Sequence, residues 1–305
     1  LVMEKEIIET SEITPVDISF VTHIKELEFN ESIFQKLTSI YEDFLAEGDP
    51  RVESWLFMAT PIPSLLIMIS YLLCVLFGPR LMTKLGPFQL KPVLATYNII
   101  QICLSFYMFQ EFLVTSYMCS YNYGCTPVDY STSELALRMA SACWLFYFSK
   151  IVDLCDTLFF ILRKKSNQLT FLHVYHHCSM IANWWLGVKF AAGGQACFPA
   201  MLNSLIHTIM YSYYYLSSMG PKLQKFLWWK RYLTQVQMIQ FFIMFAHASY
   251  SLYTSCDYPK WIAYLSLGYL TSLIILFANF YLHSYLKRPN FTKIKPFDKM
   301  AQKLD

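Results

Sequence analysis

Three histidines fall within five residues of the segment HVYHH, at His173, His176 and His177. Their spacing of i, i+3 and i+4 places the three imidazoles on one face of a helix. A clustered imidazole can bind a metal ion, act as a general base or act as a nucleophile. The flanking residues are mostly apolar, so we predict that this face lies inside a membrane span, where ionisable side chains are costly and usually functional.

Further polar side chains recur at helical spacing in the neighbouring apolar segments. They are Lys150, Asp153, Asp156 and Thr157 in one segment, Asn203 and His207 in a second, and Lys230, Thr234 and Gln237 in a third. A structural interpretation exists for some of them, because Lys150 and Asp153 could form an ion pair that only joins helices. The candidate catalytic set is His173, His176, His177, His207, Asp153 and Asp156.

The composition indicates what kind of protein carries this cluster. The chain has 305 residues, of which 55% are hydrophobic and 15% are charged, and its mean hydropathy is +0.35. Soluble domains usually contain about 25% charged residues. Thirteen of the 21 acidic residues precede residue 54, and long apolar runs follow. We therefore predict an all-α membrane protein that crosses the bilayer several times and has no nucleic-acid partner.

Seven segments are long enough, at about 20 residues each, to cross a bilayer as helices. They are predicted near residues 62–78, 92–115, 136–162, 169–188, 198–217, 232–253 and 261–284. One set of connecting loops and the C-terminal tail hold sixteen Lys and Arg residues, whereas the opposite loops hold only Lys189 and Lys260. The positive-inside rule places the first set in the cytosol, so the N-terminus is expected to be lumenal and the C-terminus cytosolic.

This orientation predicts how deep the polar residues lie in the membrane and on which side a glycosylation sequon falls. At a rise of about 1.5 Å per residue, His176 lies about 12 Å and His207 about 20 Å from the cytosolic ends of their spans. The polar groups thus converge in the cytosolic half, which predicts a pocket open to the cytosol and closed on the far side. The sequon at Asn30 falls on the lumenal side, where it could be glycosylated.

Two chemistries suit the histidine cluster. A desaturase or hydroxylase of the His-box type would bind iron through several such boxes. Only seven histidines are present, and His23, His247 and His283 lie outside the cluster. Acyl transfer needs fewer groups, namely an activated His176, a partner such as His207, and Asn203 or Gln237 as donors to an oxyanion. A seven-span receptor or a transporter would share the topology but would not need this cluster.

The predicted cytosolic loops indicate the substrate. Arg163, Lys164 and Lys165 directly precede the box, and Lys230 and Arg231 follow two tryptophans. Basic side chains beside aromatic rings suit phosphates and a stacked base. Positive-inside topology explains part of this charge, so both interpretations stay open. A substrate with a nucleotide group at the mouth of the pocket and an apolar chain within the pocket would be an acyl-CoA.

Taken together, these motifs resemble one enzyme family. From DPRVESW at 49–55 to about residue 288, the chain is similar to the very-long-chain fatty acid elongases, the 3-ketoacyl-CoA synthases of the endoplasmic reticulum. The motifs are KIVDLCDTLFFILRKKSNQLTFLHVYHH, AAGGQ, LNSLIHTIMYSYYYLS and LWWKRYLTQVQMIQ. Within that family, GGQA and LYTSCDYPKW are most similar to the protein-4 subgroup.

The resemblance implies a fold, a reaction and a set of contacts. It implies seven transmembrane helices, six of them ringed around a closed substrate tunnel, in a multi-pass protein of the endoplasmic reticulum membrane. It implies condensation of a long acyl-CoA with malonyl-CoA, with His176 as the nucleophile, His207 assisting the malonyl half, and no metal or cofactor. Other enzymes of the elongation cycle and a second copy of the chain are candidate partners. The residues matching the family's substrate path are Lys150, Arg163, Lys165, Gln168, His173, Asn203, Tyr213, Lys230, Thr234 and Gln237.

The resemblance also implies a domain division, a disulfide and one departure. The expected division is an acidic lumenal extension over 1–48, the elongase domain over 49–288, and a basic cytosolic tail over 289–305. Cys125 and Cys256 match cysteines that are joined in the family, although Cys119 could take one of the two places. The family pattern KxxExxDT has Glu where this chain has Asp153, so the carboxylate at this position reaches one methylene less far toward the histidine cluster.

Overall fold

The apolar segments of the sequence fold as helices in the computed structural model, which describes residues 33–220, 223 and 225–286. These described residues form helices, turns and loops, with no strand, which confirms the all-α class. The chain divides into two units, residues 1–48 and 49–305, and residues 33–46 of the first unit form a helix. The sequon at Asn30 and the tail over 289–305 lie outside the described residues.

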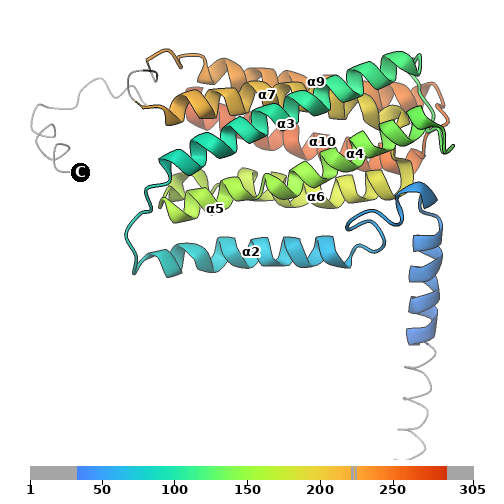
Figure 1. Cartoon of the computed structure of the whole chain (residues 1–305), viewed down its shortest axis with the longest axis horizontal. Coiled ribbons are helices and arrows are strands. Elements are labelled where there is room, and N and C mark those ends of the chain that lie inside the picture. The colour runs from blue at the N-terminus through green and yellow to red at the C-terminus, as the bar shows by residue number, and fades with distance from the viewer. Residues whose placement is uncertain (1–32, 221–222, 224, 287–305) are drawn as a thin grey trace, which may run out of the picture. The chain divides into compact units, whose positions relative to one another are not determined.

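The second unit is built from long helices that run along a common direction (Figure 1). They are α2 (Ile62–Met82), α3 (Lys91–Met118), α4 (Glu134–Val152), α5 (Cys155–Leu162), α6 (Phe171–Ala191), α7 (Cys197–Ser218), α9 (Lys230–Tyr253) and α10 (Lys260–Tyr281). Short 3₁₀ helices, η1 (Pro50–Val52), η2 (Ser166–Gln168) and η3 (Gly194–Ala196), lie between them, and a π-helical turn, η4 (Leu282–Leu286), follows α10. Each of the seven predicted spans therefore falls on a helix or a pair of helices.

Three helices among the described residues are long and apolar enough on their own to cross a membrane. They cover Ile62–Met82, Lys91–Met118 and Lys260–Leu286. The other predicted spans carry the polar side chains of the candidate site, which lowers their hydropathy. Their helical structure is confirmed, and their crossing of the bilayer stays a prediction.

The third predicted span is not one continuous helix. α4 ends at Val152 and α5 begins at Cys155, with Asp153 as the C-cap of α4. At the break, the amide of Asp156 donates to the carbonyl of Asp153 and that of Thr157 donates to Leu154, each three residues back. Such i→i+3 bonds tighten the backbone relative to an α-helix. The single helical stripe expected for the polar residues of this segment is therefore interrupted beside the candidate site.

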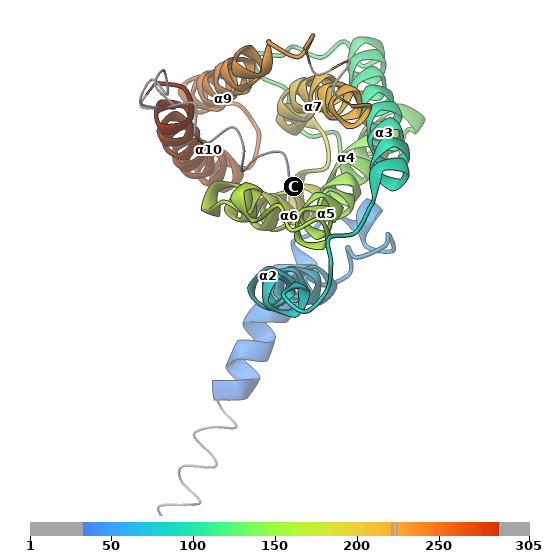
Figure 2. The same ribbon diagram turned by 90° about the vertical axis from the view of Figure 1, so that its left-hand side faces the viewer.

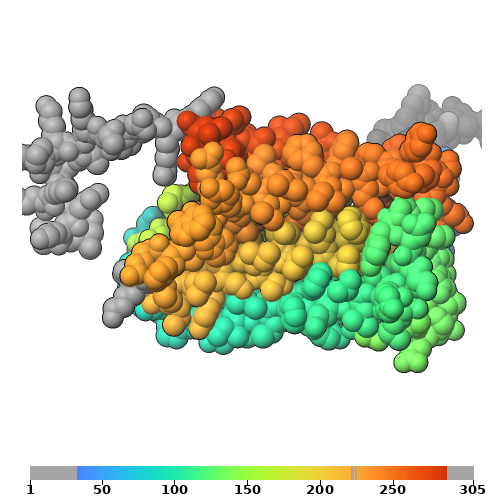
Figure 3. Space-filling view, turned by 90° about the horizontal axis from the view of Figure 1, so that it is seen from above, coloured from blue at the N-terminus to red at the C-terminus, as the bar shows by residue number. Residues whose placement is uncertain are grey.

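The helices of the second unit close a ring around the candidate site. Contacts between neighbours run in the order α3, α4, α6, α10, α9, α7 and back to α3. Viewed end-on in Figure 2, these helices surround the middle of the bundle while α2 lies outside it. α2 packs on α5 and α6, and buried hydrogen bonds join Ser64 to Tyr147 at 2.6 Å and Tyr71 to Thr157 at 3.1 Å. Figure 3 shows side chains of α9, α7 and α3 covering one face of the bundle.

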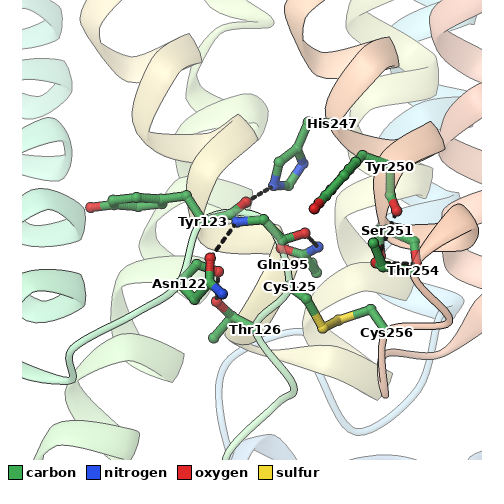
Figure 4. Close-up of a disulfide and its surroundings, with 11 residues drawn as sticks. Asn122, Tyr123, Cys125, Thr126, Gln195, His247, Tyr250, Ser251, Thr254 and Cys256 are labelled. Carbon is green, nitrogen blue, oxygen red and sulfur yellow. Dashed lines mark hydrogen bonds between the residues drawn. A yellow bond between two sulfur atoms is a disulfide. The ribbon is translucent and has the colours of Figure 1, made fainter.

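The ring has two distinct ends. We call one the disulfide end, formed by the loops over 119–133, 192–196 and 254–259, and the other the basic end, formed by 83–90, 163–170, 219–220 and 225–229. At the disulfide end Cys125 and Cys256 are joined, with their sulfurs 1.97 Å apart (Figure 4). The pairing implied by the resemblance is therefore present, and Cys119 is a free thiol.

Segment 49–53 ties several loops together at the disulfide end. Arg51 forms an ion pair with Asp49 at 2.6 Å, and its guanidinium donates to the carbonyls of Asp129 and Ala192. Both charged side chains are almost fully buried. A buried ion pair holds its geometry only where further hydrogen bonds satisfy its remaining atoms, as these carbonyls do.

Gly194 allows two of these loops to touch. Its φ is +54°, and a Cβ built there would lie 2.8 Å from the carbonyl oxygen of Thr126 and 2.9 Å from Pro127. Glycine adopts this left-handed conformation without penalty and has no side chain to clash. The AAGGQ motif therefore seats the α6–α7 connection directly against the loop that carries Cys125.

Candidate active site

The start of α6 decides where the histidines lie. Thr170 is the N-cap, and its hydroxyl accepts a hydrogen bond from the amide of His173 at 3.2 Å. An N-cap of this kind satisfies one of the amides that a helix leaves open at its start. His173 therefore falls in the first turn, and His176 and His177 fall in the second, near the basic end. The predicted helical face for the three imidazoles is confirmed.

Each imidazole of the box has different neighbours. His173 Nε2 forms a hydrogen bond with the Thr157 hydroxyl on α5 at 2.8 Å. His176 Nδ1 lies 3.2 Å from the Tyr269 hydroxyl on α10. The ring of His177 packs at 4.2 Å from that of His173 and 5.7 Å from that of His176. The box thus bridges α5 and α10, and His176 points toward the α10 side.

Lys150, Asp153, Asn203 and His207 meet between α4 and α7. Lys150 Nζ donates to Asp153 Oδ2 at 3.2 Å and to Asn203 Oδ1 at 3.3 Å, and it lies 4.4 Å above the centre of the Phe146 ring. His207 Nδ1 lies 3.8 Å from Asp153 Oδ2. Lys150 and Asp153 are each 3% exposed, so the ion pair lies in an environment that strengthens electrostatic interactions.

Two residues outside the predicted set complete the surroundings of Asp153. Gln101 Nε2 on α3 donates to Asp153 Oδ1 at 2.6 Å, and the Tyr211 hydroxyl on α7 lies 3.0 Å from the same oxygen. The Tyr211 hydroxyl also lies 2.9 Å from Asp156 Oδ2. The signal for Gln101 was present in the sequence, because a buried amide inside an apolar span is a functional candidate. Tyr211 follows His207 at i+4 and so shares its helical face, whereas no spacing in the sequence singles out Tyr269.

A long cavity connects this site with the disulfide end. His176, Asn203, Gln240 and Leu273 line it near the box, and its walls include Met180, Trp184, Met244 and Leu270. Toward the disulfide end the lining contains Gln195, His247, Ser251 and Tyr258. Gln195 Nε2 donates to the Gly124 carbonyl. His247 Nε2 donates to the Tyr123 carbonyl, as Figure 4 shows. The cavity is therefore largely apolar, with polar side chains at both ends.

The other predicted contact residues divide between two places. Arg163, Lys165 and Gln168 lie in the connection between α5 and α6 at the basic end. Tyr213 and Gln237 contact residues across or beside the α7–α9 interface. The Tyr213 ring packs on Trp229 at 5.0 Å, and Gln237 Nε2 lies 3.6 Å from the sulfur of Met210. Lys230 begins α9 and Thr234 is buried one turn later. Both groups lie at the same end of the bundle as the first turns of α6 (Figure 1).

The arrangement can support acyl transfer. The imidazole of His176 lines an apolar cavity together with the amide side chains of Asn203 and Gln240. The buried Lys150 lies beside Asn203. Among the described residues, no group of three or more His, Cys, Asp and Glu side chains is placed to hold a metal ion.

Comparison with known proteins identifies the family of this chain. The model of the ELO family, described as the GNS1/SUR4 family, matches residues 56–293. The chain is 50% identical over 238 residues to very long chain fatty acid elongase 4 of Homo sapiens, covering 78% of this chain and 76% of that protein. It is 44% identical over 262 residues to very long chain fatty acid elongase 7 of Rattus norvegicus, covering 83% and 93% of the two chains. The chain therefore belongs to the ELO (GNS1/SUR4) family and is a relative of the very long chain fatty acid elongases.

Proposed function

We propose that this chain performs the condensing step of fatty acid elongation. It joins a long or very-long-chain acyl-CoA with malonyl-CoA and releases 3-oxoacyl-CoA, CoA and carbon dioxide. Support comes from the elongase relatives at 44–50% identity and from the apolar cavity whose lining includes His176. The presence of this imidazole in the cavity wall is the observation that carries the proposal.

In the first half of the reaction, His176 takes the acyl group. When Nδ1–H donates to the Tyr269 oxygen, Nε2 keeps the lone pair and attacks the thioester carbonyl. The carbon–sulfur bond breaks, CoA leaves as the thiolate, and the proton given up by the acylated imidazole ends on that sulfur. Asn203 and Lys150 lie beside each other in the site. They are the proposed donors to the oxyanion that forms from the thioester carbonyl.

In the second half, malonyl-CoA attacks the acyl-histidine. Loss of carbon dioxide leaves an enolate, whose carbon attacks the acyl carbonyl as the bond to His176 breaks. The imidazole regains its proton from solvent, so each turnover consumes one proton. His207 lies on α7 beside Asp153 and is proposed to orient the malonyl thioester.

The cavity is the proposed site of the acyl chain, and the basic end that of CoA. Apolar side chains such as Met180, Met244 and Leu270 suit a hydrocarbon chain that runs toward the disulfide end. Arg163, Lys165 and Lys230 suit the phosphates outside. No metal or cofactor takes part in this scheme. On this proposal the protein crosses the endoplasmic reticulum membrane seven times, with the basic end cytosolic and the disulfide end lumenal.

The nucleophile is tested by His176→Ala in purified membranes that carry the protein. Incorporation of labelled malonyl-CoA in the presence of a long acyl-CoA is expected in the wild type and should fall to background in the variant. His283→Ala provides a matched control, because His283 is exposed and lies after α10. Turnover retained in His176→Ala would contradict the acyl-histidine, and activity lost on iron chelation would favour the desaturase or hydroxylase chemistry instead.

A further inference from the structure

The Tyr211 hydroxyl lies between two carboxyl groups. It is 3.0 Å from Asp153 Oδ1 and 2.9 Å from Asp156 Oδ2. A phenol carries one hydrogen, so it can donate to only one of the two carboxyl groups. If both contacts are hydrogen bonds, the other carboxyl group must donate to the phenol oxygen, and it must therefore carry a proton itself.

The neighbours of the two carboxyl groups show which one is ionised. Asp153 Oδ1 accepts a hydrogen bond from Gln101 Nε2 at 2.6 Å, and Asp153 Oδ2 accepts one from Lys150 Nζ at 3.2 Å. Asp156 has phenols as its polar neighbours, Tyr211 and Tyr97, and among the described residues no ion pair is found for it. Hydrogen-bond donors and a nearby cation stabilise the ionised form of a buried carboxyl group. A buried carboxyl group whose polar neighbours are phenols has no cation to stabilise its negative charge.

The charge count leads to the same assignment. The titratable groups that face Asp153 and Asp156 from the surrounding helices are Tyr71, Tyr97, Lys150, Cys155, His176, His207 and Tyr214. Lys150 is the one lysine or arginine in that set, and it pairs with Asp153. Two carboxylates that share one site in a low-dielectric region cannot both ionise without a second cation.

We propose that Asp153, Tyr211 and Asp156 form a hydrogen-bonded chain that holds one carboxyl proton at neutral pH, carried by Asp156. Asp156 donates to Tyr211, and Tyr211 donates to Asp153. The neutral Asp156 is thus a positioning residue, which acts through Tyr211 on the carboxylate beside Lys150 and His207.

The proton on Asp156 affects the charge state of the catalytic imidazoles, and its role in catalysis rests on the proposed condensation. A single carboxylate balances Lys150 and leaves no surplus negative charge near the imidazoles. A second ionised carboxyl group would favour protonation of His207 and of the box, and a protonated imidazole has no lone pair for attack. The proton on Asp156 therefore helps to keep His176 in its nucleophilic form.

Infrared spectroscopy tests the proton directly, without any assay of turnover. The wild type, in an ester-free detergent at neutral pH, should show the carbonyl band of a protonated carboxylic acid, shifted in deuterated water. The band should vanish in Asp156→Asn and persist in Glu134→Gln, whose carboxyl group is exposed at the start of α4. A wild type without the band overturns the proposal even if the variant does not fold, and so does a band that survives in folded Asp156→Asn.

Kinetics of two isosteric variants test the role of the proton. An asparagine amide can replace a protonated acid as a donor, but it cannot replace a carboxylate that balances Lys150. We therefore expect kcat to fall at least about tenfold further in Asp153→Asn than in Asp156→Asn. Equal losses would overturn the positioning role. A wild type that shows the infrared band but does not condense acyl-CoA would instead refute the proposed function alone.

Discussion

His176 and Tyr269 meet across α6 and α10, and this contact selects which ring nitrogen of His176 is free. The Tyr269 hydroxyl lies 3.2 Å from Nδ1 and also accepts from Ser179 at 3.2 Å. The tautomer of a histidine follows from the hydrogen bond that its other nitrogen makes. The proposed mechanism uses the tautomer in which Nδ1–H donates to the Tyr269 oxygen, which leaves Nε2 available for reaction.

Tyr269→Phe should lower kcat and leave KM for both CoA substrates nearly unchanged. Loss of one hydrogen bond of about 1 kcal/mol corresponds to roughly a fivefold lower rate, provided that the bond matters in the transition state. Steady-state kinetics with a long acyl-CoA measures the effect. Tyr175→Phe is the matched control, because it deletes a phenol that bonds Ser272 across the same helix pair. An unchanged kcat in Tyr269→Phe would show that the contact has no role in catalysis.

At the scale of elements, the connections at the basic end are placed to bind CoA outside the cavity. Removing charge by Arg163→Gln, Lys165→Gln or Lys230→Gln should raise KM for acyl-CoA more than it lowers kcat. Such contacts act on the bound substrate and on the transition state alike. Lys260→Gln changes a lysine at the disulfide end, where α10 begins, and should leave KM unaltered. If KM is unchanged in all three test variants, these residues serve membrane topology only.

The α6–α7 connection depends on glycine for its close approach to the next loop. Gly194→Ala should destabilise the protein by at least about 1–2 kcal/mol, because alanine disfavours a φ of +54° and its Cβ would clash with the backbone of Thr126 and Pro127. The thermal unfolding midpoint in detergent measures the loss. Gly268→Ala is the control, since a Cβ there meets no atom within 4 Å inside α10. Equal midpoints for the two variants would contradict the importance of this contact.

At the scale of the whole molecule, the disulfide joins the loop after α3 to the loop before α10, which are 131 residues apart. By the loop-entropy model, closing a loop of this length contributes up to about 4–5 kcal/mol, an upper value because a membrane already restrains the unfolded chain. Cys256→Ser should lower the thermal unfolding midpoint, and a reducing agent should lower that of the wild type. Cys103→Ser removes an exposed free thiol and should leave both the thermal unfolding midpoint and its sensitivity to a reducing agent unchanged. A reduced wild type with an unchanged midpoint would contradict a stabilising role.

The helices and the histidine face were predictable because they depend on local periodicity. Apolar runs of about 20 residues imply helices, and the i, i+3, i+4 spacing of the box implies one face whatever surrounds it. The break at Asp153 was not predictable, because a few i→i+3 hydrogen bonds leave no mark in a hydrophobic pattern. α2 also continues to Met82, beyond the predicted end at residue 78, because Pro79 lies within the helix without ending it.

The sequence by itself determined the element types, the histidine cluster and the family resemblance. These depend on residue identity and spacing along one chain. The tertiary structure alone decided which helices are neighbours, and so brought Gln101 of α3 and Tyr211 of α7 to Asp153, and Tyr269 of α10 to His176. Ring closure sets these distances through side-chain packing between segments far apart in sequence, and no local pattern encodes them.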